Sequence, residues 1–292
     1  MKKLNVAVVG LGNMGKHHTR NYAEIEQAAL VAVCDTNYKL AQELAEKYHC
    51  NAYNSLEDLL TNEHLDAITI AAPTIYHHTL AKEIIQKGIH LLIEKPIADT
   101  PKKAEELIKL AFQKNIILTV GHIERFNPAI LKLKEIVTRH KLGKISSIVT
   151  RRLSPLPPQI KDANVMIDLA VHDIDICSYI LNKQPLKVSG ALGKTLLKDR
   201  EDFAHILLDY GNQSCLIEVN WITPLKIRTL SITGSKGYAE LDYIKQEIFL
   251  YENNYTEKIS IPIEKKEPLK TEILHFIDCV KNQKTPIVTG KM

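Results

Sequence analysis

Residues 4–15 read LNVAVVGLGNMG, a short apolar run followed at once by three glycines spaced as GxGxxG. The run Leu4–Val9 is typical of a buried β-strand, and a helical pattern follows the glycines. A second apolar run over residues 30–34 ends at Asp35, twenty positions after Gly15 (35 − 15). This order of strand, glycine loop, helix, strand and acid is the pattern of a dinucleotide-binding βαβ unit.

Each glycine of the loop has a physical role in that interpretation. Gly10 permits the tight turn, Gly12 lets the backbone approach a pyrophosphate, and Gly15 lets the helix pack close to the strand. The free N–H groups at the helix start, together with the helix dipole, bind the anion. The residues between the glycines complete the predicted cofactor contacts: Leu11, Asn13 and Met14. The alternative is a purely structural glycine turn.

Asp35 predicts which dinucleotide is bound. Its carboxylate would accept hydrogen bonds from the adenosine ribose hydroxyls, and its negative charge would repel a 2′-phosphate. Thr36 and Asn37 supply no arginine to bind such a phosphate. The sequence therefore predicts NAD rather than NADP.

Composition sets the broad class. A chain of 292 residues is long for one core, so two domains are expected. Hydrophobic residues make up 45% and charged residues 25%, which is ordinary for a globular protein. The formal net charge of +4 is mild, and no Lys/Arg cluster stands beside aromatic residues. We therefore expect no nucleic-acid partner, while the positive balance favours an anionic substrate.

The five cysteines are odd in number and show no CxxC spacing. This usage suits a reducing cytosol and predicts neither a disulfide framework nor a zinc site. The first residues lead directly into a strand, so no signal peptide is expected, and no apolar run is long enough for a membrane helix. We expect a cytoplasmic protein with no bound metal and no membrane partner.

The first 120 residues alternate between strand-like and helical segments. The strand-like runs are continuously apolar, as in a parallel sheet covered on both faces; they span residues 4–9, 30–34, 67–71, 89–93 and 116–120. The prediction for residues 1–121 is an NAD-binding Rossmann domain, α/β in class, with a doubly wound parallel sheet.

The second half has a different pattern. Helical segments are predicted over residues 128–139, 164–181 and 269–280, and strands that alternate polar and apolar residues lie between the last two. We expect residues 122–292 to form a C-terminal α+β domain for substrate binding, with a large open, mostly antiparallel sheet. Since few helices are available to cover that sheet, a homodimer or homotetramer formed through it is expected.

Glu94, Lys95 and Pro96 follow the apolar run 89–93, at the carboxyl end of a strand, where open α/β sheets bind ligands. A partly desolvated Lys95 there can accept or donate a proton. The alternative is a surface lysine at a strand end. Another strand end, Ala72-Pro73-Thr74, precedes His77, and we expect these four residues to contact the cofactor together with Glu94 and Lys95. For His77, local packing is the alternative.

Asp168 and His172 stand four residues apart in the helical segment 164–181 and would share one face, with Asp175 and Tyr179 continuing the stripe. His172 is the candidate general base, oriented by Asp168, while Lys95 is the rival base or the partner that stabilises an alkoxide. The alternative is a solvated polar stripe on an amphipathic helix.

Two arginines are candidates for substrate contact. Arg125, in the crossover segment 121–128, could bind a hydroxyl or phosphate, or pair with Glu124 instead. Arg152, next to Arg151, directly precedes a proline-rich loop over residues 154–158. Two cations beside a stiff loop suit a diphosphate.

Taken together, the glycine loop with Asp35, the Ala72-Pro73-Thr74 strand end, Glu94-Lys95-Pro96 and Asp168-x3-His172 resemble the Gfo/Idh/MocA oxidoreductases over nearly the whole chain. The resemblance implies a Rossmann domain, a C-terminal domain with a large open sheet, a nicotinamide dinucleotide and a sugar or polyol substrate. It also implies that Lys95, Asp168 and His172 form the catalytic group, and that Arg125 lies in the substrate cleft.

Within that family, residues 121–128, 151–158 and 167–175 resemble the branch that oxidises the 3-hydroxyl of UDP-N-acetylglucosamine. The resemblance implies a place in the nucleotide-sugar metabolism that supplies lipid A or surface polysaccharide. Two alternatives stay open: a dehydrogenase of a free sugar or inositol, and a non-catalytic cofactor-binding regulator of the same fold. The presence of Lys95, Asp168 and His172 argues against the regulator.

Overall fold

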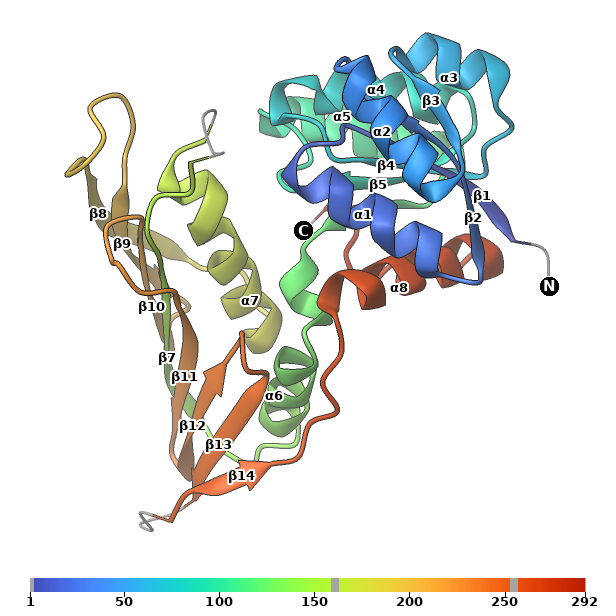
Figure 1. Cartoon of the computed structure of the whole chain (residues 1–292). Coiled ribbons are helices and arrows are strands. Elements are labelled where there is room, and N and C mark those ends of the chain that lie inside the picture. The colour runs from blue at the N-terminus through green and yellow to red at the C-terminus, as the bar shows by residue number, and fades with distance from the viewer. Residues whose placement is uncertain (1–2, 159–162, 253–256, 292) are drawn as a thin grey trace. The chain divides into compact units, whose positions relative to one another are not determined.

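The structure is a computed structural model that describes residues 3–158, 163–252 and 257–291. The chain forms two compact units, drawn in Figure 1. Unit 1 contains Met1–Ile123 and Leu269–Met292, and unit 2 contains Glu124–Pro268. Each unit has its own sheet and its own core.

The sheet of unit 1 has six parallel strands in the order β3-β2-β1-β4-β5-β6. The order reverses between β1 and β4, so their carboxyl ends form the switch point at which such sheets bind ligands. The strands are β1 (Leu4–Val9), β2 (Ala28–Cys34), β3 (Asn51–Tyr53), β4 (Ala67–Ile70), β5 (His90–Glu94) and β6 (Leu118–Gly121). The predicted doubly wound sheet is confirmed, with β3 as an additional short edge strand.

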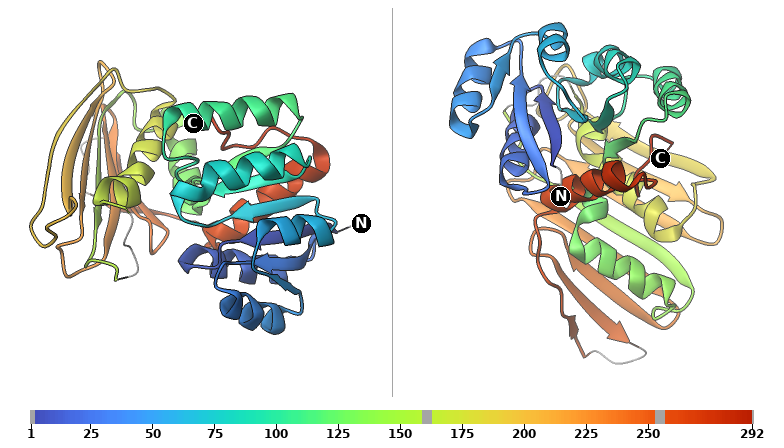
Figure 2. Two further views of the ribbon diagram at one scale, coloured as in Figure 1. Left: turned by 90° about the horizontal axis from the view of Figure 1, so that it is seen from above. Right: turned by 90° about the vertical axis from the view of Figure 1, so that its right-hand side faces the viewer.

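Helices cover both faces of this sheet, and the alternation along β1 shows which face each one covers. Val6 and Val8 pack with α1 (Asn13–Glu24), α2 (Tyr38–Tyr48) and α8 (Pro268–Asn282). Ala7 and Val9 pack on the other face, whose helices are α3 (Leu56–Asn62), α4 (Thr74–Gln86) and α5 (Pro101–Gln113). Figure 2 shows these two helical layers from two further directions. Apolar side chains on both faces explain why the strands read as continuous hydrophobic runs.

The C-terminal helix α8 belongs to unit 1, and here the structure differs from the predicted domain 122–292. Ile273, Phe276 and Ile277 of α8 are buried in the same core as Val6 and Val8 of β1. Thr119 of β6 also donates a 2.7 Å hydrogen bond to the Val288 carbonyl beyond the helix. The chain therefore leaves unit 1 near Ile123, forms unit 2, and returns to cover the first sheet.

The sheet of unit 2 has eight strands in the order β14-β13-β12-β11-β7-β10-β9-β8. All neighbours are antiparallel except β7 and β10, which run parallel, so the predicted mostly antiparallel sheet is confirmed. The strands are β7 (Ile145–Leu153), β8 (Lys187–Gly193), β9 (Phe203–Asp209), β10 (Ser214–Asn220), β11 (Ile227–Gly234), β12 (Gly237–Asp242), β13 (Glu247–Glu252) and β14 (Ile259–Ile261).

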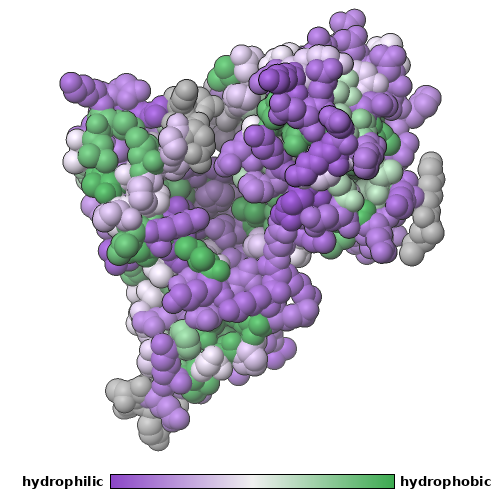
Figure 3. Space-filling model, viewed as in Figure 1, coloured by the Kyte–Doolittle hydropathy of each residue, from purple (hydrophilic) through white to green (hydrophobic). Residues whose placement is uncertain are grey.

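The helices α6 (Pro128–Thr138) and α7 (Val171–Leu181) lie on one face of this sheet, as Figures 1 and 2 show. Inward residues such as Ile206, Ile217 and Ile232 form one core with both helices, while Leu207 and Leu216 of the other face are 42% and 45% exposed. A further apolar patch lies over β8 and the loop after it in Figure 3; its exposed residues are Val188, Leu192 and Leu196. The helices therefore cover only one face of the sheet.

The predicted single helix over residues 164–181 is wrong at its start. Met166–Ala170 form a π-helical turn, and α7 follows at Val171. The Asn164 side chain accepts a 3.1 Å hydrogen bond from the Ile167 N–H, so the helical segment begins after Asn164. Such wide turns recur at functional sites.

Two features are absent from the described residues, a membrane-spanning helix and a metal-binding cluster. No helix in that part of the chain has both the length and the apolar character needed to span a bilayer. The same residues contain no cluster of three or more histidine, cysteine or acidic side chains arranged to hold a metal ion.

Candidate dinucleotide site and catalytic residues

The glycine loop at the end of β1 has the geometry of a pyrophosphate cradle. Gly10 has a φ of +85°, and a Cβ there would lie 2.5 Å from the Ala72 backbone nitrogen. A Cβ on Gly15 would collide with the Gly10 carbonyl oxygen. By contrast, a Cβ on Gly12 would meet nothing within 4 Å, and α1 begins directly after Gly12. Only glycine fits the turn and the helix contact, while the space at Gly12 is open to a ligand, so the loop fits a dinucleotide.

Asp35 ties the end of β2 to this loop. One of its carboxylate oxygens accepts a 2.7 Å hydrogen bond from the Leu11 N–H, and the other accepts a 2.8 Å hydrogen bond from the Asn37 N–H. The side chain is therefore fixed beside the glycine loop with its negative charge in place. Each oxygen retains lone pairs for a ribose hydroxyl.

We expect Asp35→Ala to weaken NAD binding by roughly 10–100-fold and to reduce the preference for NAD over NADP. The variant loses a charged hydrogen-bond acceptor, the anchor of the Leu11 amide and the charge that opposes a 2′-phosphate. Dissociation constants for both cofactors, measured by fluorescence titration, test this. Asp99→Ala, which removes an acid that pairs with Lys103 in the same unit, is the control. A wild-type preference for NADP would contradict this interpretation of Asp35.

At the end of β5, Glu94 is buried and ion-paired. One of its oxygens lies 2.8 Å from His18 Nε2, and the other accepts the Lys95 N–H at 3.3 Å. Burial opposes ionisation of Glu94, but the His18 contact and the charges of His18 and Lys95 outweigh it and lower the pKa of this carboxyl. Glu94 thus fixes the backbone from which the Lys95 side chain extends, and its charge lies next to that lysine.

Helix α8 places a second acid, Glu272, close to Glu94. Glu272 is only 1% exposed, and burial followed by the charge of Glu94 raises the pKa of its carboxyl well above the usual range. Burial and the charge of Glu94 thus favour the protonated form of Glu272, whereas the contacts of Glu94 favour its ionised form. The sequence does not predict this contact, because the predicted boundary at residue 122 puts residues 269–280 in the second domain.

His77 connects two predicted site segments. Its two ring nitrogens each lie 2.8 Å from a backbone carbonyl oxygen, that of Ala72 at the end of β4 and that of Pro96 after Lys95. The side chain is buried at the start of α4, which begins at Thr74 after the N-cap residue Pro73. The contacts favour local packing, the second of the two sequence interpretations of His77.

The predicted catalytic residues come from both units. Lys95 belongs to unit 1, and Asp168 and His172 belong to unit 2. Asp168 lies in the π-helical turn and His172 in the first turn of α7, and both are half-buried. The widened turn therefore carries the acid itself, and the helix that follows it carries the histidine.

Arg152 lies in a buried ion network with Asp173, the residue after His172, and Glu124. Its Nε donates to Asp173 at 2.8 Å, its Nη1 to Glu124 at 2.8 Å, and its Nη2 to Asp173 at 3.3 Å. Burial lowers the pKa of this guanidinium, but the two carboxylates outweigh burial and raise it well above the ordinary value. Since Arg152 is 4% exposed and each nitrogen has a carboxylate partner, this geometry does not support the predicted contact with a diphosphate.

Arg125 forms a second buried pair, with Asp175 rather than with Glu124. Its Nε and Nη2 donate to the two Asp175 oxygens at 2.7 and 2.5 Å, and its guanidinium lies over the Tyr179 ring at 4.8 Å. Asp175 and Tyr179, expected to continue a stripe with His172, are thus the partners of Arg125. Two bidentate arginines fix the rotation of α7 about its axis.

The sequence did not predict two members of this network, Tyr243 and Arg228. The Tyr243 hydroxyl donates to Asp173 at 3.4 Å, and Arg228 donates to the Leu153 carbonyl at 2.6 Å. Burial and the neighbouring Arg152 lower the pKa of Arg228 to about 10. A signal was available in the sequence, because Arg228 alternates in register with Leu230 and Ile232 of the core face of β11.

The chain belongs to the GFO/IDH/MocA oxidoreductase family. The domain described as "Oxidoreductase family, NAD-binding Rossmann fold" matches residues 4–122, and the family's C-terminal domain matches residues 130–240. The two matches fall in the two units, and the predicted family resemblance is confirmed. Unit 1 is the NAD-binding domain of an oxidoreductase.

Individual relatives agree with this assignment. UDP-N-acetylglucosamine 3-dehydrogenase from Acidithiobacillus ferrooxidans is 29% identical, over 96% of this chain and 90% of the relative. The NAD(+)-dependent scyllo-inositol 2-dehydrogenase from Bacillus subtilis is 28% identical, over 98% of this chain and 89% of that protein. A solved structure of the Acidithiobacillus enzyme matches with a TM-score of 0.89 at 27% identity, covering 100% of this chain and 93% of the other.

Proposed function

We propose that the protein oxidises a secondary alcohol of a sugar nucleotide with NAD, and that its substrate is UDP-N-acetylglucosamine, converted to the 3-keto sugar. The observation that carries this proposal is the likeness to the Acidithiobacillus 3-dehydrogenase over both domains, at 29% identity and 96% of the chain. The presence of Lys95, Asp168 and His172 in this sequence supports catalysis over a purely regulatory role.

In the proposed reaction, the glycine loop and Asp35 would hold NAD, which would supply the hydride acceptor for the carbon that bears the alcohol. The remaining task is to remove the hydroxyl proton, which needs a base within about 3 Å of that oxygen. We assign this proton to His172, with Asp168 orienting or electrostatically tuning the imidazole. Lys95 stabilises the developing negative charge on the oxygen, and its backbone is fixed by Glu94.

A second candidate is the oxidation of inositol or a free sugar by the same residues. It is favoured by the likeness to scyllo-inositol 2-dehydrogenase, at 28% identity over 98% of this chain. The two candidates differ in whether a uridine diphosphate group is needed for turnover.

A substrate screen at the NADH absorbance separates these candidates. UDP-N-acetylglucosamine, UDP-glucose, N-acetylglucosamine, myo-inositol and scyllo-inositol are each supplied with NAD to the full-length protein. We expect turnover with UDP-N-acetylglucosamine and at least roughly 100-fold lower kcat/KM without the diphosphate, since charge-assisted contacts are lost. Higher kcat/KM with either inositol would establish the second candidate, and absence of turnover with every compound would contradict both.

We also propose that the protein is a homodimer or homotetramer that buries the open face of the eight-stranded sheet. The support is the one-sided covering of that sheet, which leaves Leu207 and Leu216 exposed. Light scattering coupled to size-exclusion chromatography is expected to give two or four times the 33.0 kDa chain mass. A monomer at micromolar concentration would contradict the proposal.

A further inference from the structure

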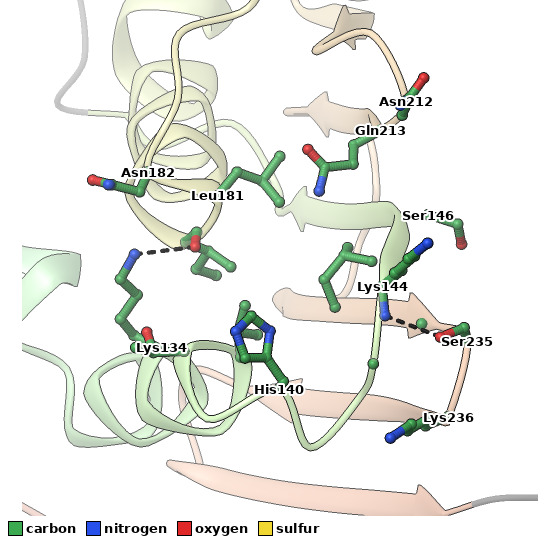
Figure 4. Close-up of a pocket in the computed structure, with 16 residues that line it drawn as sticks. Lys134, His140, Lys144, Ser146, Leu181, Asn182, Asn212, Gln213, Ser235 and Lys236 are labelled. Atoms are coloured by element: carbon green, nitrogen blue, oxygen red, sulfur yellow. Dashed lines mark hydrogen bonds between the residues drawn. The ribbon is translucent and has the colours of Figure 1, made fainter.

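A pocket in unit 2 lies between the carboxyl ends of α6 and α7 and one end of the sheet (Figure 4). Its volume is about 1630 Å³. Four basic residues line it, from the α6 helix, the segment after it and the β11–β12 hairpin, and no acidic residue does so; the four are Lys134, His140, Lys144 and Lys236. None of these four forms an ion pair within the described part of the chain.

The pocket is distinct from the predicted substrate residues of unit 2. Lys144 directly precedes β7, and Arg152 is close to the other end of that strand, about 26 Å away at ~3.3 Å per residue. Along α7, His172 lies in the first turn, whereas Leu181, which lines the pocket, is the last residue. The pocket therefore lies at the opposite end of both elements.

Two uncharged side chains in the pocket, those of Gln213 and Ser235, also have N–H or O–H groups available to donate. Gln213 accepts a 2.9 Å hydrogen bond from Lys183 at its amide oxygen, which leaves its NH₂ group to donate. Ser235 Oγ accepts a 3.0 Å hydrogen bond from the Lys144 N–H, which leaves its hydroxyl hydrogen to donate. In Figure 4, Gln213 and Leu181 extend toward each other from opposite sides of the pocket.

The partial negative charge at the carboxyl end of α7 does not cancel the positive charge of the basic residues that line the pocket. Carbonyl oxygens at a helix C-terminus carry partial negative charge, which would oppose an anion. Lys134 Nζ donates to the carbonyls of Tyr179 and Ile180 at 2.6 and 3.1 Å, so the end of α7 already has a cation. His140, Lys144 and Lys236 remain as cationic or donor groups without an acidic partner among the described residues.

We propose that this pocket binds a small molecule bearing a phosphate or diphosphate group, at a site separate from the one assigned to catalysis. A phosphate offers only acceptor oxygens and more than one negative charge, which matches side chains that donate and carry positive charge. Lysine binds phosphate as a point charge, so ammonium groups from separate elements can converge on one polyvalent anion. This proposal does not depend on the identity of the sugar substrate.

Inorganic pyrophosphate is the probe that tests the site. It is titrated by calorimetry into the full-length chain saturated with NAD, at constant ionic strength, so that the dinucleotide site is filled. We expect saturable binding of one pyrophosphate per chain, weakened at least about tenfold by the double variant Lys144→Ala/Lys236→Ala. The variant should retain dehydrogenase activity, because neither lysine is among the residues assigned to catalysis.

The matched control is Lys245→Ala/Lys265→Ala, which removes the same charge from two exposed lysines of unit 2 that have acidic partners. Lys245 follows the carboxyl end of β12, whereas Lys236 precedes its start. Equal weakening by both double variants would show non-specific attraction and overturn the proposal, as would absence of saturable binding to the wild type. Tighter binding of citrate than of pyrophosphate would overturn the assignment to phosphate.

Discussion

Replacing His172 or Lys95 with alanine is expected to lower kcat by roughly 10²–10⁴-fold while NAD still binds. The proton of the substrate hydroxyl needs an acceptor, and the developing charge on that oxygen needs a cation or donor beside it. Neither task is part of holding the dinucleotide, for which the structure provides the glycine loop and Asp35. Turnover and NAD affinity, measured on the same preparations, check the separation of the two effects.

The pH profile of kcat then distinguishes the base from its partner. A neutral histidine with an ordinary pKa of about 6.5 accepts a proton near neutral pH, so activity falls on the acidic side as the imidazole becomes protonated. We expect that acidic limb to disappear in His172→Ala and to persist in Lys95→Ala. His64→Ala, which changes an exposed histidine of unit 1 outside its helices and strands, serves as the control. If both single variants keep near wild-type turnover, the assignment of the catalytic residues is wrong.

Replacing Arg152 with alanine is expected to lower the free energy of unfolding by roughly 3–5 kcal/mol. The substitution leaves Asp173 and Glu124 without their shared cation, and Asp173 is fully buried. Such a loss is a large fraction of the stability of an ordinary domain. Urea denaturation, followed by the fluorescence of the single Trp221 in the core of unit 2, measures it.

The neighbouring Arg151 is a matched control for this prediction. Arg151 is exposed and donates a 2.7 Å hydrogen bond to Glu218 across the sheet, so Arg151→Ala is expected to cost less than about 1 kcal/mol. If Arg152→Ala unfolds like the wild type and instead raises only the KM for the sugar nucleotide, then Arg152 contacts substrate, as the sequence alone had predicted. Equal losses of stability in the two variants would show that the buried network has no special role.

The sequence predicted features that depend on local patterns. The glycine loop, the parallel strands and the acid at the end of β2 all follow from spacing within about thirty-five residues. The alternating strands of the second half likewise gave the mostly antiparallel sheet, because one face packs on helices and the other does not. The residues assigned to NAD binding and catalysis were found by their place at strand ends and on one helix.

What the sequence could not predict depends on partners far away in the chain. The sequence predicts substrate contact for Arg152, and substrate contact or a pair with Glu124 for Arg125, because their actual partners, Asp173 and Asp175, lie 21 and 50 residues later. The position of α8 also depends on partners far away in the chain. Its apolar stripe could cover either sheet, and only the structure shows that it packs with β1. The π-helical turn was missed because a single widened turn leaves the hydrophobic pattern of residues 164–181 almost unchanged.

The return of α8 to unit 1 has a consequence for how the protein is made. The ribosome completes the six strands of the first sheet about 150 residues before it synthesises the helix that covers Val6 and Val8. Until then, one face of the nascent NAD-binding unit lacks part of its apolar cover, and a chain interrupted after Ile123 exposes that face to water. Premature termination or cleavage within unit 2 therefore yields a fragment prone to aggregation and not a small functional NAD-binding protein.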